Sequence, residues 1–358
     1  MGYGYWGSKH VRVLSKIPGV TVTIVDADAK RRHVASIQFP TARLSTTLDH
    51  VLDDVDAAII ATPPTSHVAA ALPALAAGKH LLIEKPLATS VDDAELLVAT
   101  AARAGAVLMV GHTFEYNPAV WKVKEIIDSG VIGRVLYIDM QRLSLGRYQS
   151  DCDVIWDLAT HDISIASYFL DELPSSAAVW AQRNIGVHHA DVAYLRLDFA
   201  RCGTYAFVHV SWLHPHKVRR VTVVGEQKMV VYDDMSDNER VRIYDVGVDP
   251  SDIDNAAAAH GMPVSYRTGD IVSPYVSFEE PLLIQDRHFI DCVRTDRRPN
   301  TPGERGLDVV RVLAATHTPS SVGGPVRIEY GTKPAEVQYT APPPASPSIR
   351  SDQIEVAL

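Results

Sequence analysis

GYGYWG, at residues 2–7, is the stretch of sequence that decides the fold, because its glycines have the spacing G-x-G-x-x-G. Glycines at this spacing allow a tight turn, a close approach of another group to the backbone and close packing of a helix. We expect a helix from Ser8 whose first N–H groups point at the phosphates of a dinucleotide. The alternative interpretation is a glycine-rich segment that binds no ligand, because the pattern is short.

The position of Asp26 favours dinucleotide binding over a glycine-rich segment without a ligand. Asp26 ends the apolar run Val20–Val25 and lies about 20 residues after the glycines, where an acid meets the adenosine ribose. A carboxylate accepts a hydrogen bond from the ribose 2′-hydroxyl and repels a 2′-phosphate, so the sequence favours NAD over NADP. NADP is not excluded, because the basic residues Lys30, Arg31 and Arg32 follow closely. We interpret them as the solvated first turn of a helix.

Residues 1 to about 113 alternate short apolar runs with helical patterns, which is typical of βαβ units and a parallel sheet. The later runs are nearly continuous, as expected for strands covered on both faces. Ser90, with Asp93 three residues later, indicates the start of a helix. The expected strands are Val20–Val25, Ala57–Ala61, His80–Ile83 and Ala106–Gly111, and the expected helices include His67–Ala77 and Val91–Ala104.

From about Val135 apolar and polar residues alternate over longer segments, which indicates an antiparallel sheet with one polar face. These segments are Asp191–Ala200, Tyr205–Trp212, Val218–Val224 and Met229–Tyr232. The sequence therefore predicts an α/β Rossmann domain at residues 1–115. An α+β domain with an open, mainly antiparallel sheet, for substrate binding and oligomerisation, follows at 116–332. We expect residues 333–358, which are rich in proline, to form a flexible tail.

The start of the chain conflicts with this fold. A Rossmann sheet has a central strand that leads into the glycine turn, but only Met1 precedes Gly2. Without that strand, buried N–H and C=O groups of Val20–Val25 and Ala57–Ala61 lose partners, at about 1–3 kcal/mol each. We therefore expect the first strand to be truncated and the natural start to lie several residues upstream, within an apolar strand. The chain as written should be less stable and bind NAD poorly.

Composition and charge exclude several classes of protein. The chain has 358 residues, 46% of them hydrophobic and 22% charged, which suits two globular domains. Its net charge of −9, from 34 basic and 43 acidic residues, argues against a nucleic-acid partner. It has no apolar run that could span a membrane and no signal peptide. The three scattered cysteines, Cys152, Cys202 and Cys292, fit a reducing cytoplasm.

Two motifs follow expected strands directly. The segment Ala61–His67 (ATPPTSH) and the segment Glu84–Pro86 (EKP) would lie beyond the carboxyl ends of parallel strands, where open α/β sheets bind ligands. A lysine in this place, Lys85, can stabilise negative charge on a substrate oxygen. The alternatives are a simple turn capped by Ser66 and a surface ion pair. Pro86 argues against the second alternative because it fixes the backbone.

Asp157 and His161 lie four residues apart, so on a helix they share one face. Histidine carries protons near neutral pH, and a neighbouring carboxylate can orient it. The same spacing suits a metal site, but no cluster of cysteine, histidine or acidic residues elsewhere completes one. We therefore expect no metal.

These four motifs, in this order, resemble those of the Gfo/Idh/MocA oxidoreductase family. The third of them extends over Ala77–Pro86 (AGKHLLIEKP), and the resemblance runs from Gly2 to about Tyr330. It implies a Rossmann domain followed by an open antiparallel sheet. The segment Gly111–Pro118 matches the family's hinge G-H-x-x-x-Y-N-P. Glu115 departs from the arginine or apolar residue expected there, which puts in doubt a substrate contact at that position.

The resemblance also implies roles for single residues. Lys85 would be the catalytic lysine, His161 the general acid/base and Asp157 the residue that orients the substrate, while Glu84 would contact the nicotinamide ribose. The residues expected at the cofactor are Gly2, Gly4, Tyr5, Trp6, Gly7, Asp26, Thr62, Pro63, His67, Glu84 and Lys85. Those expected at the substrate are Lys85, Tyr116, Asn117, Arg142, Asp157, His161, Lys217 and Arg219.

The form W-D-L-x-x-H-D at residues 156–162 is similar to that of UDP-N-acetylglucosamine 3-dehydrogenases and related sugar 3-oxidoreductases. Arginine and lysine side chains at residues 142, 147, 217 and 219 could pair with a diphosphate, or could be solvated charges on the sheet. We therefore expect an NAD-dependent oxidoreductase of a nucleotide sugar, acting at C3. The alternating strands between Asp191 and Tyr232 indicate an open sheet with apolar residues on its free face, so we also expect a homodimer or homotetramer.

Two alternatives stay open. One is an inositol or free-sugar dehydrogenase. The other is a sensor that binds a dinucleotide without catalysis, although such a protein would need neither Lys85 nor His161.

Overall fold

The computed structural model describes residues 1–146, 148–149, 151–186, 188–248, 266–317, 324–331 and 353–358. The chain divides into two compact units, each with its own large sheet. The first unit comprises Met1–Tyr116, Glu279–Ala314 and Tyr330–Leu358, and the second comprises Asn117–Phe278 and Ala315–Glu329. We expected residues 279–314 in the second domain, but their helices pack on the first unit.

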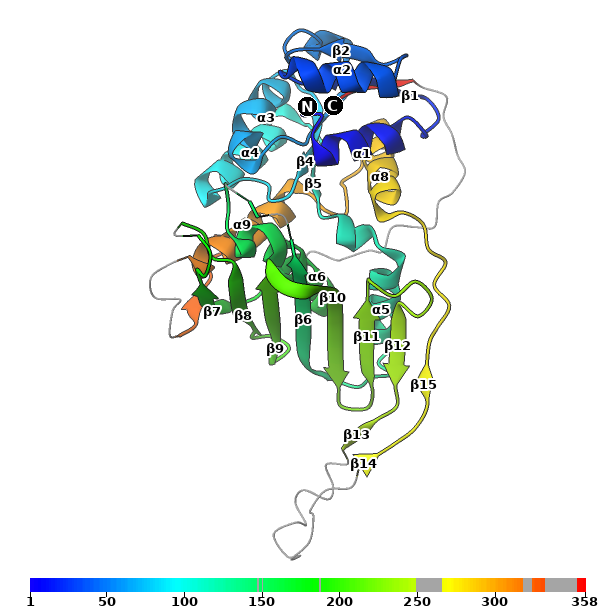
Figure 1. Ribbon diagram of the computed structural model, residues 1–358, viewed down its shortest axis with the longest axis vertical. Coiled ribbons are helices and arrows are strands. Elements are labelled where there is room, and N and C mark those ends of the chain that lie inside the picture. Colours follow the sequence, from blue (N-terminus) through cyan, green and yellow to red (C-terminus); the bar gives the residue numbers. More distant parts are fainter. Residues whose placement is uncertain (147, 150, 187, 249–265, 318–323, 332–352) are drawn as a thin grey trace, which may run out of the picture. The chain divides into compact units, whose positions relative to one another are not determined.

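The first unit contains a six-stranded sheet in which every pairing is parallel. The expected strands are confirmed, with ends that differ by two residues or fewer. Their apolar side chains are buried because helices cover the sheet (Figure 1). In spatial order the strands are β2 (Arg43–Ser45), β1 (Val20–Val25), β17 (Ile354–Ala357), β3 (Ala57–Ile60), β4 (His80–Glu84) and β5 (Leu108–Gly111).

Strand β17 fills the central position that we expected to be empty. It runs parallel to β1 and to β3, and its Val356 lies opposite Val22 on one side and Ala57 on the other. The expectation that the sheet of this chain lacks a central strand is therefore wrong, and so is that of a flexible tail for the last residues. The proline-rich composition before them concealed the short apolar run Ile354–Leu358, whose apolar side chains are buried in the sheet. Residues 332–352 lie outside the described part.

Helices and short 3-10 turns connect these strands. Ser90 caps α4 as expected, because its hydroxyl accepts a hydrogen bond from the N–H of Asp93. The helices of this unit are α1 (Tyr5–Leu14), α2 (Ala29–Gln38), α3 (His67–Ala76), α4 (Val91–Ala104), α8 (Pro281–Thr295) and α9 (Gly303–Thr316), the last of which ends in the second unit. The 3-10 turns are η1 (Leu52–Asp54), η2 (Pro64–Ser66) and η3 (Thr113–Tyr116).

The second unit contains a nine-stranded sheet that is antiparallel except between β6 and β9. The spatial order is β15 (Ile271–Val272), β12 (Val241–Tyr244), β11 (Met229–Asp233), β10 (Leu213–Gly225), β6 (Val135–Leu145), β9 (Thr204–Ser211), β8 (Val192–Phe199), β7 (Ser176–Gln182) and β16 (Val326–Arg327). Helices α5 (Pro118–Asp128) and α6 (Thr160–Leu170) lie together on one face of it (Figure 1). Strands β13 (Gly247–Val248) and β14 (Tyr266–Arg267) form a separate pair.

The alternation expected in β8 is confirmed. Ala193, Leu195, Leu197 and Phe199 are buried under the helices, whereas Tyr194 is about half exposed on the other face. This periodicity explains why one face of the sheet forms a core and the other does not. Among the described residues, no helix combines the length and the apolar character needed to cross a lipid bilayer.

Candidate active site

The glycine turn has the geometry of a phosphate cradle. Gly2 has φ +97°, and a Cβ on Gly7 would lie 1.9 Å from the carbonyl oxygen of Gly2, so neither position tolerates a side chain. A Cβ on Gly4 would meet no atom within 4 Å, which leaves open space at the start of α1. That helix begins at Tyr5 rather than at Ser8, and no side chain caps it. Its first N–H groups can therefore bind an anion.

The strand, turn and helix of this motif come from both ends of the chain, which lie side by side (Figure 1). Leu358 extends β17, and its N–H donates to the carbonyl oxygen of Thr23 at 2.7 Å. The turn continues where β17 stops, because the N–H of Gly2 donates to the carbonyl oxygen of Val25 at 2.8 Å. The turn thus lies beside β17 at the point where the strand order reverses, which is the ligand crevice of open α/β sheets.

Asp26 follows β1 at the same edge of the sheet. Its carboxylate accepts hydrogen bonds from the N–H groups of Tyr3 and Asp28, both at 2.7 Å, so the side chain is fixed beside the glycine turn. The three basic residues lie in the first turn of α2, as we interpreted them. Arg32 donates to main-chain carbonyl oxygens, and Arg31 lies 3.6 Å from the Asp26 carboxylate. The carboxylate of Asp26 is therefore buried, whereas the side chain of Arg31 is exposed.

Thr62 lies beside the glycine turn, with its methyl group 3.1 Å from the Cβ that Gly2 would carry. Its buried hydroxyl has no hydrogen-bond partner in the described part of the chain, which suits a polar group of a bound cofactor. Pro63 is exposed. His67 differs from the expected cofactor contact, because it is fully buried and its nitrogens lie 3.0 Å from the carbonyl oxygens of Thr62 and Pro86. It connects the loop after β3, which contains Thr62, to the loop after β4, which contains Pro86. Burial lowers the pKa of His67.

Glu84 and Lys85 lie at the carboxyl end of β4, and the peptide bond between Lys85 and Pro86 is cis. Glu84 is 5% exposed, and one of its oxygens accepts a hydrogen bond from the N–H of Lys85 at 3.2 Å. A Cβ on Gly111 would lie 2.9 Å from the other oxygen, so this carboxylate requires a glycine on the neighbouring strand β5. Lys85 is half buried. Together with the glycine turn and Asp26, these residues fit an NAD molecule along one edge of the sheet.

Sequence reasoning missed two residues near Glu84, namely His10, which contacts Glu84, and Asp286, which contacts His10. His10 on α1 lies 2.9 Å from Glu84 and 2.9 Å from Asp286 on α8. The position of His10, three residues after Gly7, was a usable signal, because a histidine on the buried face of that helix needs a polar partner. Asp286 gave no local signal, because its partner is 276 residues away in the sequence.

Glu115 and Arg305 explain the departure from the family pattern at position 115. They form a buried ion pair at 2.7 Å, so the carboxylate is directed at α9. His112 is buried and lies within electrostatic range of the positive charges of Arg305 and Lys85. Burial first, and then these two charges, lower the pKa of His112 to about 3, so it is neutral at physiological pH.

In the second unit, Asp157 lies in a π-helical turn, Ile155–Ala159, and His161 lies in the first turn of α6. The indole N–H of Trp212 donates to the Asp157 carboxylate at 3.0 Å, which fixes this side chain. Both Asp157 and His161 are half buried, and Nδ1 of His161 is itself a buried atom. A π turn at the start of a helix is a frequent feature of functional sites.

Several expected substrate residues have structural roles instead. Arg142 is buried and pairs in bidentate fashion with Asp162, at 2.9 and 3.1 Å, so its guanidinium is not presented to a diphosphate. The hydroxyl of Tyr116 lies 3.0 Å from that of Thr301, and Tyr116 is fully buried. Asn117 is also buried.

The Asn117 side chain caps α5, because it accepts a hydrogen bond from the N–H of Ala119. Lys217 is exposed. Arg219 pairs with Asp234 at 3.2 Å and stays partly exposed. The expectation for Arg147 falls outside the described residues.

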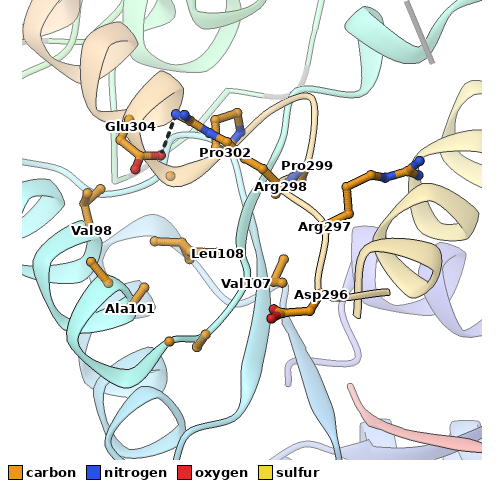
Figure 2. Close-up of a pocket in the computed structure, with 14 residues that line it drawn as sticks. Val98, Ala101, Val107, Leu108, Asp296, Arg297, Arg298, Pro299, Pro302 and Glu304 are labelled. Atoms are coloured by element: carbon orange, nitrogen blue, oxygen red, sulfur yellow. Dashed lines mark ion pairs between the residues drawn. The ribbon is translucent and has the colours of Figure 1, made fainter. Parts of the chain in front are cut away.

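A pocket of about 290 Å³ in the first unit is distinct from this site (Figure 2). It lies between α4, the start of β5, the loop at residues 296–302 and the start of α9. The start of β5 is at the opposite edge of the sheet from the glycine turn, so the pocket does not belong to the cofactor site. Among the described residues, no group of three histidine, cysteine or acidic side chains could hold a metal ion.

Comparisons with known proteins agree with this geometry. Residues 1–112 match the model of the oxidoreductase family with an NAD-binding Rossmann fold, and residues 120–231 match that of the GFO/IDH/MocA C-terminal domain. A D-apiose dehydrogenase from Paraburkholderia graminis is 25% identical over 341 residues, which cover 92% of this chain and 88% of the relative. A UDP-N-acetylglucosamine 3-dehydrogenase from Acidithiobacillus ferrooxidans is 28% identical over 255 residues, which cover 69% of this chain and 76% of the relative.

The fold is also similar to that of GenD2 from gentamicin A biosynthesis, solved in complex with NAD. The TM-score is 0.76 at 25% sequence identity, and the match covers 92% of this chain and 95% of GenD2. The two family models together match more than half of the chain, one in each unit. The chain therefore belongs to the Gfo/Idh/MocA family and is an NAD-binding oxidoreductase that acts on CH–OH groups.

Proposed function

We propose that the protein transfers a hydride between the nicotinamide of NAD and a secondary alcohol or ketone carbon of a sugar, with a nucleotide sugar, reacting at C3, as the substrate. One observation carries the proposal. Lys85 directly follows Glu84 at the carboxyl end of β4, on the same sheet edge as the glycine turn and Asp26. A lysine beside the nicotinamide end of the cofactor can act on the oxygen of the reacting carbon.

NAD supplies a hydride acceptor when it is bound. His161 takes the proton of the substrate hydroxyl, and Lys85 stabilises the negative charge that develops on the same oxygen. Asp157, fixed by the indole of Trp212, orients the substrate. In the reverse direction His161 returns the proton to the oxygen, so the same residues serve a ketone reduction.

A nucleotide sugar is favoured by similarity to the UDP-N-acetylglucosamine 3-dehydrogenase and by two cationic side chains on β10. Lys217 is exposed, and the side chain of Arg219 is partly exposed beside Asp234. Either can pair with a diphosphate. A free sugar is the second candidate, because the D-apiose dehydrogenase matches 92% of the chain.

The test is NADH formation by the full chain with a panel of nucleotide sugars, free sugars and inositols. The proposal predicts turnover of a UDP-sugar and a higher KM for Lys217→Ala with little change in kcat. Turnover of free sugars alone, unaffected by Lys217→Ala, would assign the second candidate.

We also propose a homodimer or homotetramer that packs through the second unit. The face of the nine-stranded sheet opposite α5 and α6 carries half-exposed aromatic side chains, namely Tyr137, Trp180, Tyr194, Tyr205 and Phe207. Exposed aromatic residues in such number are typical of interfaces. Sedimentation of the wild type and of Phe207→Glu tests this, because a wild type that is monomeric at micromolar concentration would refute it.

A further inference from the structure

His10, Glu84 and Asp286 form a buried array of one imidazole between two carboxylates. Nδ1 of His10 lies 2.9 and 3.0 Å from the two oxygens of Asp286, and Nε2 lies 2.9 Å from Oε1 of Glu84. His10 and Asp286 are fully buried and Glu84 is 5% exposed. Three elements therefore meet at this array, namely helix α1, strand β4 and helix α8.

The geometry favours a doubly protonated imidazole. A neutral histidine has one N–H, yet here each ring nitrogen faces a carboxylate oxygen, and only the imidazolium can donate to two ionised carboxylates at once. Burial by itself lowers the pKa of His10, but the charges and hydrogen bonds of Asp286 and Glu84 outweigh it and raise the pKa to about 10. Burial raises the pKa of Asp286, and the imidazolium opposes this shift. We therefore place the proton on His10 at physiological pH.

The array divides the two oxygens of Glu84 between different tasks. Oε1 is occupied by His10, whereas Oε2 accepts only the 3.2 Å hydrogen bond from the N–H of Lys85 among the bonds described. A carboxylate oxygen can accept a further hydrogen bond. Oε2 is therefore the atom that can receive a ribose hydroxyl, and His10 does not itself touch the cofactor.

We propose that His10 is a positioning residue that keeps the Glu84 carboxylate ionised and directed at the nicotinamide ribose, with Asp286 holding the imidazole from the other side. This inference rests on the proposed role of Glu84 at the cofactor. It extends the site to α8, which is remote in sequence from the nucleotide-binding motifs.

Other groups that face the array do not replace the imidazolium. Arg12 on α1 lies within electrostatic range of Asp286, but it forms an ion pair with Glu280 at the start of α8. His67 on α3 lies within electrostatic range of Glu84, but burial lowers its pKa and favours the neutral form. Gln285 donates to Asp286 and is uncharged. Lys85 is adjacent to Glu84 in the chain and half buried.

The experiment measures the dissociation constant for NADH by fluorescence titration between pH 6 and 9. The wild type should show no pH dependence in this range, because His10 keeps its proton. The double variant His10→Gln, Asp286→Asn keeps amide hydrogen bonds but leaves the buried Glu84 carboxylate without a cation. Burial favours its protonated form, so NADH binding should weaken as the pH falls, by up to about tenfold per pH unit.

Two controls separate this effect from general damage to the helix packing. Arg12→Gln removes the other ion pair between α1 and the start of α8, and it should leave NADH binding independent of pH. Glu84→Gln should bind NADH weakly at every pH, because it has no carboxylate to titrate. Equal weakening of the double variant at all pH values would overturn the inference.

A further measurement does not depend on whether the double variant folds. In wild-type protein labelled with ¹⁵N-histidine, the His10 ring nitrogens should keep imidazolium chemical shifts up to pH 9. Titration of His10 near pH 6 to 7 would overturn the inference. A wild type that binds no NADH would instead refute the proposed cofactor site and can be distinguished from both results.

Discussion

Removal of residues 353–358 should unfold the first unit, because these residues supply the central strand of its sheet. β17 has a neighbouring strand on both sides, so its loss leaves main-chain groups of β1 without partners, such as the carbonyl oxygen of Thr23 and the N–H of Val25, which both pair with Leu358. Each buried group left unpaired costs about 1–3 kcal/mol. Several such groups approach the whole stability of a domain, about 5–15 kcal/mol.

Point substitutions in β17 should destabilise the first unit by smaller amounts. Val356→Ala removes two methyl groups from a fully buried position and should cost about 1–3 kcal/mol, or roughly 2–4 °C of Tm for each kcal/mol. Glu355→Ala is the matched control on the same strand, because this side chain is only half buried and should matter little. Thermal unfolding and NADH titration measure both effects. A deletion of residues 353–358 that changed neither would refute our account of the sheet.

Three further predictions concern single groups. Asp26 should make NADH bind more tightly than NADPH in fluorescence titrations, and Asp26→Ala should narrow the difference; equal binding by the wild type would mean that Arg31 outweighs the acid. Lys85→Ala and His161→Ala should each lower kcat by roughly 10²–10⁴-fold, the usual effect of losing an acid/base group, in steady-state assays with the true substrate. Near-normal turnover of either variant would disprove the assigned role. Glu115→Gln should cost about 3–5 kcal/mol in chemical denaturation because it leaves Arg305 charged and buried, whereas no loss would show that water satisfies that guanidinium.

Local patterns predicted most elements of the fold. The apolar run Val20–Val25 is a strand over the same residues, and the two-residue alternation after Asp191 is a half-buried strand. Both features depend on neighbouring side chains in the sequence, so they can be derived from it. The position of β17 could not, because a run of five residues, Ile354–Leu358, is equally compatible with a loop.

The candidate site shows the same division. The glycine turn, Asp26 and Glu84–Lys85 were predicted, because strand ends and glycines are local signals. Whether a cationic residue is exposed depends on its partner. Arg142 was expected at a diphosphate, but Asp162 on α6 binds it in the core, and nothing near either residue in the sequence indicates that pair.

Hydride transfer from a sugar carbon to NAD can be followed by isotope transfer. The enzyme would be incubated with NAD and a UDP-sugar that carries deuterium at C3, and the NADH formed would be examined by mass spectrometry and NMR. We predict deuterium at C4 of the nicotinamide, and no transfer with the Lys85→Ala, His161→Ala double variant. Unlabelled NADH, or no NADH with any UDP-sugar, free sugar or inositol, would contradict the account.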